Sequence, residues 1–243
     1  MEIVMHFSPV QDLPVIFCAL DTPDFERAGL LARQIGPVTG GLKLGLEFFN
    51  AQGPEGVLRV MEAAGDAALF LDLKFHDIPN TVAGAVRSIC GRIKPAYLNV
   101  HASGGADMMR AAKEACAPGT KLLAVTILTS LDEEAIAQTG FHACLPERVE
   151  QLALLAKESG LDGVVCSAHE IALLRRACGP DFILMVPGIR PEGAEAGDQK
   201  RVMTPQSALE AGANHLVIGR PITGARDPAE AARGILAGLD RAA

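Results

Sequence analysis

The feature that most constrains the fold is a regular alternation along the chain. From Val15 to Arg220, short apolar runs alternate with helical patterns of roughly 10–15 residues, which is typical of parallel βα units. About eight such units follow one another, the number that closes a (β/α)₈ TIM barrel. An open doubly wound sheet could also give this alternation, but it usually has fewer strands. We therefore predict an α/β chain in which residues 1–243 form a single (β/α)₈ barrel domain.

Turn and cap signals give the bounds of the predicted elements. The first helix is expected between Thr22-Pro23 and Gly36-Pro37, and the second from about Pro54 to Ala64. The third strand enters at Leu69 and is ended by Pro79. The other predicted strands are Val15–Leu20, Gly41–Leu44, Tyr97–His101, Leu122–Leu128, Gly163–Ser167, Phe182–Val186 and His215–Ile218.

Composition excludes several classes of protein. The 243 residues are 49% hydrophobic, enough for one large core, and the net charge of −7 argues against nucleic acid or an anionic membrane as partner. The six cysteines show neither a CxxC pair nor a zinc spacing. No signal peptide and no apolar run of about 20 residues is evident. These observations predict a reduced, cytoplasmic protein.

Charged residues interrupt the third apolar strand. Asp72 and Lys74 share one face of it, and Asp77 follows just past its end. The neighbouring carboxylates stabilise the charged form of Lys74. A charged lysine is a poor nucleophile, so Lys74 is better suited to hold a proton at a place where negative charge develops. A structural salt bridge closing the end of a barrel strand is the alternative interpretation.

Polar residues gather at the carboxyl ends of the other strands too. In a barrel these ends meet at one mouth, where active sites are built, and this convergence favours a functional site over isolated salt bridges. The residues concerned are Asp21, Lys43, Asp72, Lys74, Thr129, Arg190 and Arg220.

The last two strands are followed by a predicted phosphate site. Loops after strands seven and eight often bind phosphate in such barrels. Gly219 and Arg220 would supply a closely approaching backbone N–H and a bidentate guanidinium, and Pro221 would start a short helix. The glycine-rich segment 191–200, with Gln199, is expected to be a mobile lid. A tight turn and a long solvated loop are the alternatives.

Histidines contribute less to the prediction. Asn99 and His101 share a face of the fourth strand, and either could touch a ligand, although a structural role is the preferred interpretation for His101. His76 is expected to orient its neighbours rather than react. The remaining histidines form no metal cluster with carboxylates, so no metal site is predicted.

These residues together resemble the orotidine 5′-phosphate decarboxylase family. The resemblance rests on Asp-Leu-Lys-Phe-His-Asp-Ile-Pro-Asn-Thr at 72–81 and extends from about Val15 to Pro228. It includes Ala-Leu-Asp at 19–21, Leu-Lys-Leu-Gly at 42–45, Asn-Val-His-Ala-Ser-Gly-Gly at 99–105, Leu-Thr-Ser at 128–130, Pro-Gly-Ile-Arg-Pro at 187–191, Gly-Asp-Gln at 197–199 and Ile-Gly-Arg-Pro at 218–221.

The resemblance implies a cofactor-free homodimer that converts orotidine 5′-phosphate to uridine 5′-phosphate in pyrimidine synthesis. It implies that Lys74 protonates the carbon that loses the carboxylate and that Asp72 faces that carboxylate. Lys43 and Asp77 would complete a Lys-Asp-Lys-Asp network, with Asp77 and Thr81 reaching into the partner's site. Further substrate contacts would come from Asp21 and Lys43 on the ribose, Thr129 on the base, and Arg190, Gln199, Gly219 and Arg220 on the phosphate side.

Two other functions stay open at this point. Related barrels with an Asp-x-Lys-x-x-Asp strand bind magnesium and act on phosphosugars as aldolases or keto-acid decarboxylases; the Ile-Pro-Asn-Thr continuation and Lys43 argue against them. A non-catalytic barrel that binds a phosphorylated ligand is the second. It would have no need of a charged lysine between carboxylates.

Overall fold

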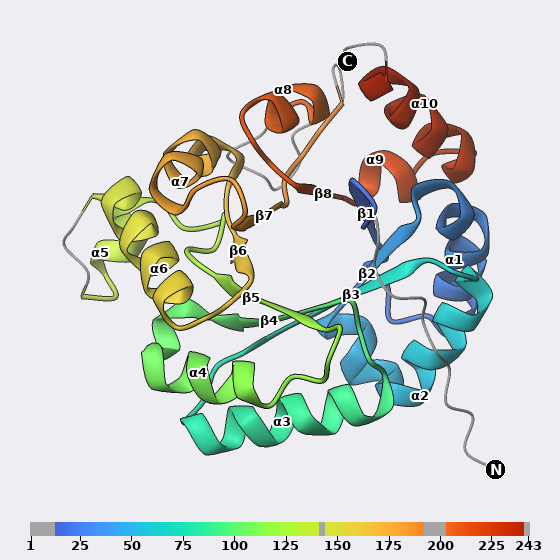
Figure 1. The fold of residues 1–243 in the computed structure, drawn as a ribbon. Helices are drawn as coiled ribbons and strands as arrows, with labels where there is room; N and C mark the ends of the chain where they lie inside the picture. The colour runs from blue at the N-terminus through green and yellow to red at the C-terminus, as the bar shows by residue number, and fades with distance from the viewer. Residues whose placement is uncertain (1–12, 141–143, 192–202, 241–243) are drawn as a thin grey trace.

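A closed barrel of parallel strands forms the centre of the molecule (Figure 1). The computed structural model describes residues 13–140, 144–191 and 203–240. The strands pair in chain order around the barrel, which confirms the predicted (β/α)₈ architecture. They are β1 (Ile16–Ala19), β2 (Gly41–Gly45), β3 (Ala68–Phe75), β4 (Tyr97–His101), β5 (Lys121–Val125), β6 (Gly163–Val165), β7 (Ile183–Val186) and β8 (His215–Ile218).

Helices surround the barrel on the outside (Figure 1). No helix in the described part of the chain is long and apolar enough to cross a membrane. The helices are α1 (Phe25–Thr39), α2 (Leu46–Ala64), α3 (Pro79–Arg92), α4 (Ala106–Glu114), α5 (Glu133–Ala137), α6 (Leu145–Glu158), α7 (Ile171–Cys178), α8 (Pro205–Glu210), α9 (Arg220–Thr223) and α10 (Pro228–Asp240), with 3₁₀ turns η1 (Ala102–Gly104) and η2 (Ala168–Glu170).

Helix α1 differs from its predicted bounds at both ends. It is capped by Asp24, whose carboxylate accepts the backbone N–H of Arg27 at 2.9 Å. The prediction that it ends at Gly36-Pro37 is wrong. The helix runs through Pro37 to Thr39, and Gly40 terminates it in the left-handed conformation at φ 67°. Pro37 is exposed, so the carbonyl that loses its helical donor there can bond to water.

Helix α2 begins earlier than predicted. A first segment starts at Leu46, and the helix is kinked at Gly53, whose φ is 62°, before Pro54 opens the second segment. The sequence indicated only that second segment, because Gly-Pro is a helix-start signal that hides helical residues in front of it.

Two apolar cores stabilise this arrangement. The larger lies between the strands and the surrounding helices, and the smaller fills the inside of the barrel. In the smaller core the ring of Phe17 packs edge-on against Phe70 and Tyr97, with ring centroids 6.3 and 5.6 Å away. These rings help to fill the barrel interior, which is a packed core rather than a pore.

His215 completes the packed interior as a neutral side chain. Its Nδ1 lies 2.8 Å from the carbonyl of Pro14, which can only accept, so Nδ1 carries the proton. Its Nε2 then accepts the hydroxyl of Tyr97 at 2.7 Å. Burial lowers the pKa of His215, and this outweighs the bond to Pro14, which favours the charged form.

Candidate active site

A cavity of about 430 Å³ lies at the mouth of the barrel, where the strands end. Its volume is in the range of small-molecule sites. It brings together eight of the side chains and backbone positions that the sequence singled out. These are Asp21, Lys43, Asp72, Lys74, Thr129, Arg190, Gly219 and Arg220.

Alternating charges cross the floor of this cavity. The Nζ of Lys43 lies 3.0 Å from Asp21 Oδ1 and 3.5 Å from Asp72 Oδ2. The Nζ of Lys74 lies 2.6 Å from Asp72 Oδ1. Strands β1, β2 and β3 are neighbours in the barrel, and each contributes at its carboxyl end. The structure therefore assembles an Asp-Lys-Asp-Lys chain from one protomer.

Burial and ion pairing compete at the two central members of the chain. Burial lowers the pKa of Lys43, but the carboxylates of Asp72 and Asp21 outweigh burial and raise the pKa above its ordinary value. Burial likewise raises the pKa of Asp72, and Lys43, Lys74 and the amide of Asn99 outweigh it, so the pKa of Asp72 is lowered. Both side chains are therefore charged at neutral pH.

Two arginines that follow the last two strands form a cationic rim of the cavity. Arg190 is buried after β7, and Arg220 follows β8 at the start of α9. Burial, and then the nearby guanidinium of Arg220, lower the pKa of Arg190 from its ordinary value. Two guanidinium groups that repel each other in this way are stabilised by an anion between them.

The backbone that carries Arg190 is tied to the far side of the β7–α8 connection. The backbone N–H of Arg190 donates to the carbonyl of Met203 at 3.0 Å, next to an isolated bridge between Ile189 and Met203. This bond closes the base of the segment predicted to be a lid. Gln199 and most of that segment lie outside the described residues.

Gly219 has φ −108° and ψ −103°, outside the main α and β regions. A Cβ there would meet Ala19 at 3.5 Å in ordinary contact. The predicted short helix after it exists as α9, with Gly219 as its N-cap.

Asp77 and Thr81 are the predicted site residues that stand apart. Both are exposed, and neither lines the cavity of its own chain. Asp77 accepts the backbone N–H of Ile78 at 2.6 Å, in the turn between β3 and α3. Ile78 is 66% exposed, although it is a large apolar residue. The Lys-Asp-Lys-Asp network is thus not completed within a single chain.

The apolar wall of the cavity was not predicted. It is formed largely by inward-facing residues near the ends of strands and by the loop after β5. The signal was available, because every second residue of a barrel strand points inward. The wall residues are Ala19, Phe70, Val125, Ile127, Leu128, Val165 and Val217.

His101 and His76 face each other beside the cavity rather than lining it. Their ring centroids are 5.5 Å apart. Burial first, and then the charges of His76 and Lys74, lower the pKa of His101, opposed by Asp72. The structural interpretation preferred for His101 thus agrees with its position.

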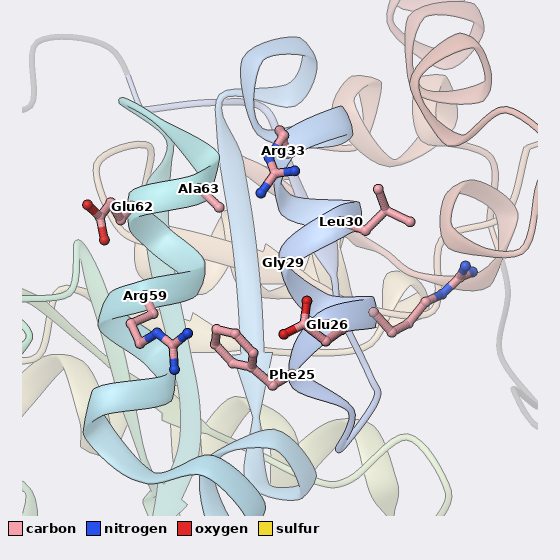
Figure 2. A pocket seen from close by; sticks show the side chains of 9 residues that line it. Phe25, Glu26, Gly29, Leu30, Arg33, Arg59, Glu62 and Ala63 are labelled. Carbon is pink, nitrogen blue, oxygen red and sulfur yellow. The ribbon is translucent and has the colours of Figure 1, made fainter.

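A larger hollow, of about 680 Å³, lies outside the barrel between α1 and α2 (Figure 2). There the guanidinium of Arg59 lies 4.2 Å from the ring centre of Phe25. This hollow is an open surface groove of mixed charge, and no paired lysine and carboxylate meet in it. Despite its size we place the candidate site at the barrel mouth, because the buried ionic chain is there.

Among the described residues, no group of three or more His, Cys, Asp or Glu side chains is arranged to hold a metal ion.

Fold and site together define a class of protein. A TIM barrel whose mouth carries a buried lysine–carboxylate chain together with two arginines is typical of an enzyme that acts on a small phosphorylated substrate. The family model described as "Orotidine 5'-phosphate decarboxylase / HUMPS family" matches residues 14–235. The chain belongs to this family.

Individual relatives agree. The chain is 51% identical over 234 residues to orotidine 5′-phosphate decarboxylase of Moorella thermoacetica, covering 93% of this chain and 92% of that protein. It is 52% identical over 226 residues to the enzyme of the same name from Thermobifida fusca, covering 93% and 96%. The crystal structure of orotidine 5′-phosphate decarboxylase from Lactobacillus acidophilus superposes with a TM-score of 0.82 at 35% identity, covering 94% and 100%.

Proposed function

We propose that this protein is a carboxy-lyase that converts orotidine 5′-phosphate to uridine 5′-phosphate in pyrimidine biosynthesis. The observation that carries the proposal is the ionic chain at the barrel mouth, with Lys74 2.6 Å from Asp72. The names of the relatives, at about half identity over most of the chain, support the same activity.

Lys74 is the proton donor in this proposal. The bond between the pyrimidine ring and the substrate carboxylate breaks, carbon dioxide leaves, and the electron pair stays on the ring carbon. The Lys74 ammonium stabilises that developing negative charge and then transfers a proton to the carbon. Solvent afterwards restores the proton on Lys74, so no external oxidant or reductant is required.

The other residues of the ionic chain position Lys74 and bind the sugar. Asp72 faces the substrate carboxylate. The negative charge of Asp72 is stabilised by Lys43, whose Nζ lies 3.5 Å from Asp72 Oδ2. Repulsion between Asp72 and that carboxylate would raise the energy of the bound substrate. Asp21 and Lys43, paired at 3.0 Å, are the proposed ribose contacts.

The arginine rim is the proposed phosphate site. Arg190 and Arg220 supply charge, and Gly219 leaves room for the phosphate beside them. Thr129 lines the cavity and is the proposed base contact. Gln199 is assigned to the phosphate side by family resemblance alone. Binding energy from the phosphate can be used to lower the barrier at the distant ring.

The proposed active form is a homodimer of barrel domains, with Asp77 and Thr81 completing the partner's site. Three observations support it: both residues are exposed in the segment after β3, neither lines its own cavity, and the apolar Ile78 beside Asp77 is 66% exposed. A two-fold interface over this turn would bury Ile78 and carry Asp77 across.

A cytoplasmic location, without metal or other cofactor, completes the proposal. All six cysteines are free thiols, as is usual in reducing compartments. A magnesium-dependent phosphosugar enzyme of the same family is the competing function. The names of the relatives at about half identity weigh against it.

The test follows the ultraviolet absorbance of orotidine 5′-phosphate mixed with purified protein, with uridine 5′-phosphate identified as product. The same assay is repeated after exhaustive chelation. Turnover that survives chelation supports the proposal. Activity that disappears and returns with magnesium would contradict the cofactor-free mechanism. An unchanged substrate spectrum would contradict the proposed activity and leave the phosphosugar enzyme and the non-catalytic binding protein as the alternatives.

A further inference from the structure

Lys74 has a backbone conformation that side-chain-bearing residues rarely adopt. Its φ is 49°, in the left-handed region. The pairing of β3 with β4 explains why: Leu71 pairs with Leu98 and Phe75 with Val100, so residues 72–74 of β3 face the single residue Asn99 of β4. Such a bulge interrupts the ladder. Strained residues of this kind persist only when their surroundings hold them in place.

Asn99 supplies the bonds that the interrupted ladder lacks. Its Oδ1 accepts the backbone N–H of Lys74 at 2.7 Å, and its Nδ2 donates to Asp72 Oδ1 at 2.7 Å. The orientation of the amide is fixed by chemistry, because a backbone N–H needs an acceptor and a carboxylate needs a donor. Asn99 is fully buried.

One amide therefore bridges the two groups of the proposed chemistry. Asp72 Oδ1 accepts both from Asn99 and from Lys74 Nζ, at 2.7 and 2.6 Å. Asn99 does not line the cavity, so it acts on a ligand only through these neighbours.

We infer that Asn99 is a positioning residue, which fixes the Lys74 ammonium and the Asp72 carboxylate relative to each other by holding the bulge of β3. This inference rests on the proposed role of Lys74. A merely structural amide at this place would affect folding stability and leave the chemical step of the folded enzyme unchanged.

Two substitutions separate these roles. Asn99→Ala removes both bonds, and kcat should fall about 100-fold, the cost of a displacement of about 1 Å in a catalytic group. Affinity for uridine 5′-phosphate, measured by calorimetry, should change by less than about threefold, because its phosphate and ribose are held elsewhere.

Asn99→Asp is the sharper variant, because it is nearly isosteric. At neutral pH the introduced carboxylate would face Asp72 and repel it; when protonated, it donates to Asp72 and still accepts from Lys74. The kcat of the variant, divided by that of the wild type at each pH, should therefore rise as pH falls from about 8 to about 5. Both proteins share the facing groups Asp72, Lys74, Lys43 and His101, so the ratio reports the pH dependence that the introduced carboxylate adds, both by its own titration and through these neighbours.

Asn214→Ala is the matched control. Asn214 also accepts a backbone N–H, that of Leu184 at 2.9 Å, but it precedes β8 at the opposite end of the barrel. The Asn214→Ala variant should be less stable than wild type and should keep the wild-type kcat.

Each result decides the inference. It is overturned if kcat of Asn99→Ala stays within about threefold of wild type, if the Asn99→Asp ratio is flat with pH, or if neither variant folds, which would make Asn99 structural. Wild type and Lys74→Ala are assayed in parallel. An inactive wild type or an active Lys74→Ala would contradict the proposed function instead.

Discussion

At the scale of the residue, Asp72 carries the most interactions at the site. It accepts from Asn99 and Lys74 on one oxygen and faces Lys43 on the other. Its lowered pKa means that its charged form is favoured by folding, so it contributes stability above the pKa of the unfolded chain and loses it as pH falls through the folded pKa.

Asp72→Asn should therefore destabilise the protein at neutral pH by about 3 kcal/mol, because it leaves two cations without their shared carboxylate. The difference from wild type should be constant from about pH 5 to 7 and shrink as pH falls below about 4, because the unfolded wild-type chain then binds a proton at Asp72 that the folded protein binds only at lower pH. Urea unfolding at several pH values measures it. Asp107→Asn, at an exposed surface pair, is the control, and its difference in unfolding free energy from wild type should stay near zero. An Asp72→Asn difference that does not shrink in acid would contradict the stabilising role of the Asp72 charge.

Arg220 gives a second prediction at this scale. Arg220→Ala should raise KM and lower kcat together, because phosphate binding is used to lower the barrier at the ring. A substrate analogue without phosphate should be turned over poorly by the wild type and be nearly indifferent to the substitution. If the analogue and the full substrate respond equally, Arg220 has a structural role.

At the scale of the element, the two ends of the strands have different tasks. The carboxyl ends form the site, and the opposite ends hold the barrel together. Arg175 of α7 illustrates the second task. Its guanidinium donates to the carbonyls of Gly179, Phe182 and Gly212 and to Asn214 Oδ1, at 2.6 to 3.1 Å. It thus joins α7 to the starts of β7 and β8.

Arg175→Ala should lower the unfolding free energy by about 2–3 kcal/mol, because several charge-assisted bonds are lost. Arg175→Lys should lower the unfolding free energy by a smaller amount, since a lysine cannot reproduce all the bonds of the planar guanidinium group. Thermal unfolding and kcat are measured side by side, and kcat below the transition should match wild type. Loss of kcat in a fully folded variant would show that this end of the barrel is coupled to the site.

How far the sequence predicts each element depends on whether the cause is local. Strands β4 and β8 have their predicted bounds, because apolar runs bounded by turn residues determine them. The bulge at Lys74 could not be predicted, since it depends on Asn99 arriving from the next strand. The cavity residues were predictable because strand ends converge in a barrel. The distances between the paired side chains could not be predicted, because they depend on how the strands are placed in the folded barrel.

At the scale of the whole molecule, one barrel gathers eight of the predicted site residues around its cavity and leaves Asp77 and Thr81 outside it. Asp72 and Lys74 meet within one chain, whereas Asp77 lies in the exposed turn after β3, beside exposed Ile78. In the proposed symmetric dimer, each site takes Lys74 from one chain and Asp77 from the other.

Mixing inactive Lys74→Ala and Asp77→Ala chains should then restore activity. A mixed dimer has one site with both defects and one with neither. With random exchange about half the dimers are mixed, so roughly a quarter of all sites should be intact. Activity is followed after mass measurement confirms exchange. If exchanged dimers remain as inactive as the parents, Asp77 serves its own chain.

In the proposed mechanism Lys74 delivers the proton. The most direct test of this role is the turnover of orotidine 5′-phosphate by Lys74→Ala, with Lys113→Ala as matched control. Lys113 is exposed to a similar extent as Lys74 and also pairs with an aspartate, Asp162, but away from the cavity. Lys74→Ala should fold and lose nearly all kcat and kcat/KM, while Lys113→Ala keeps both. Folded Lys74→Ala that retains more than about a few per cent of wild-type kcat would contradict the account.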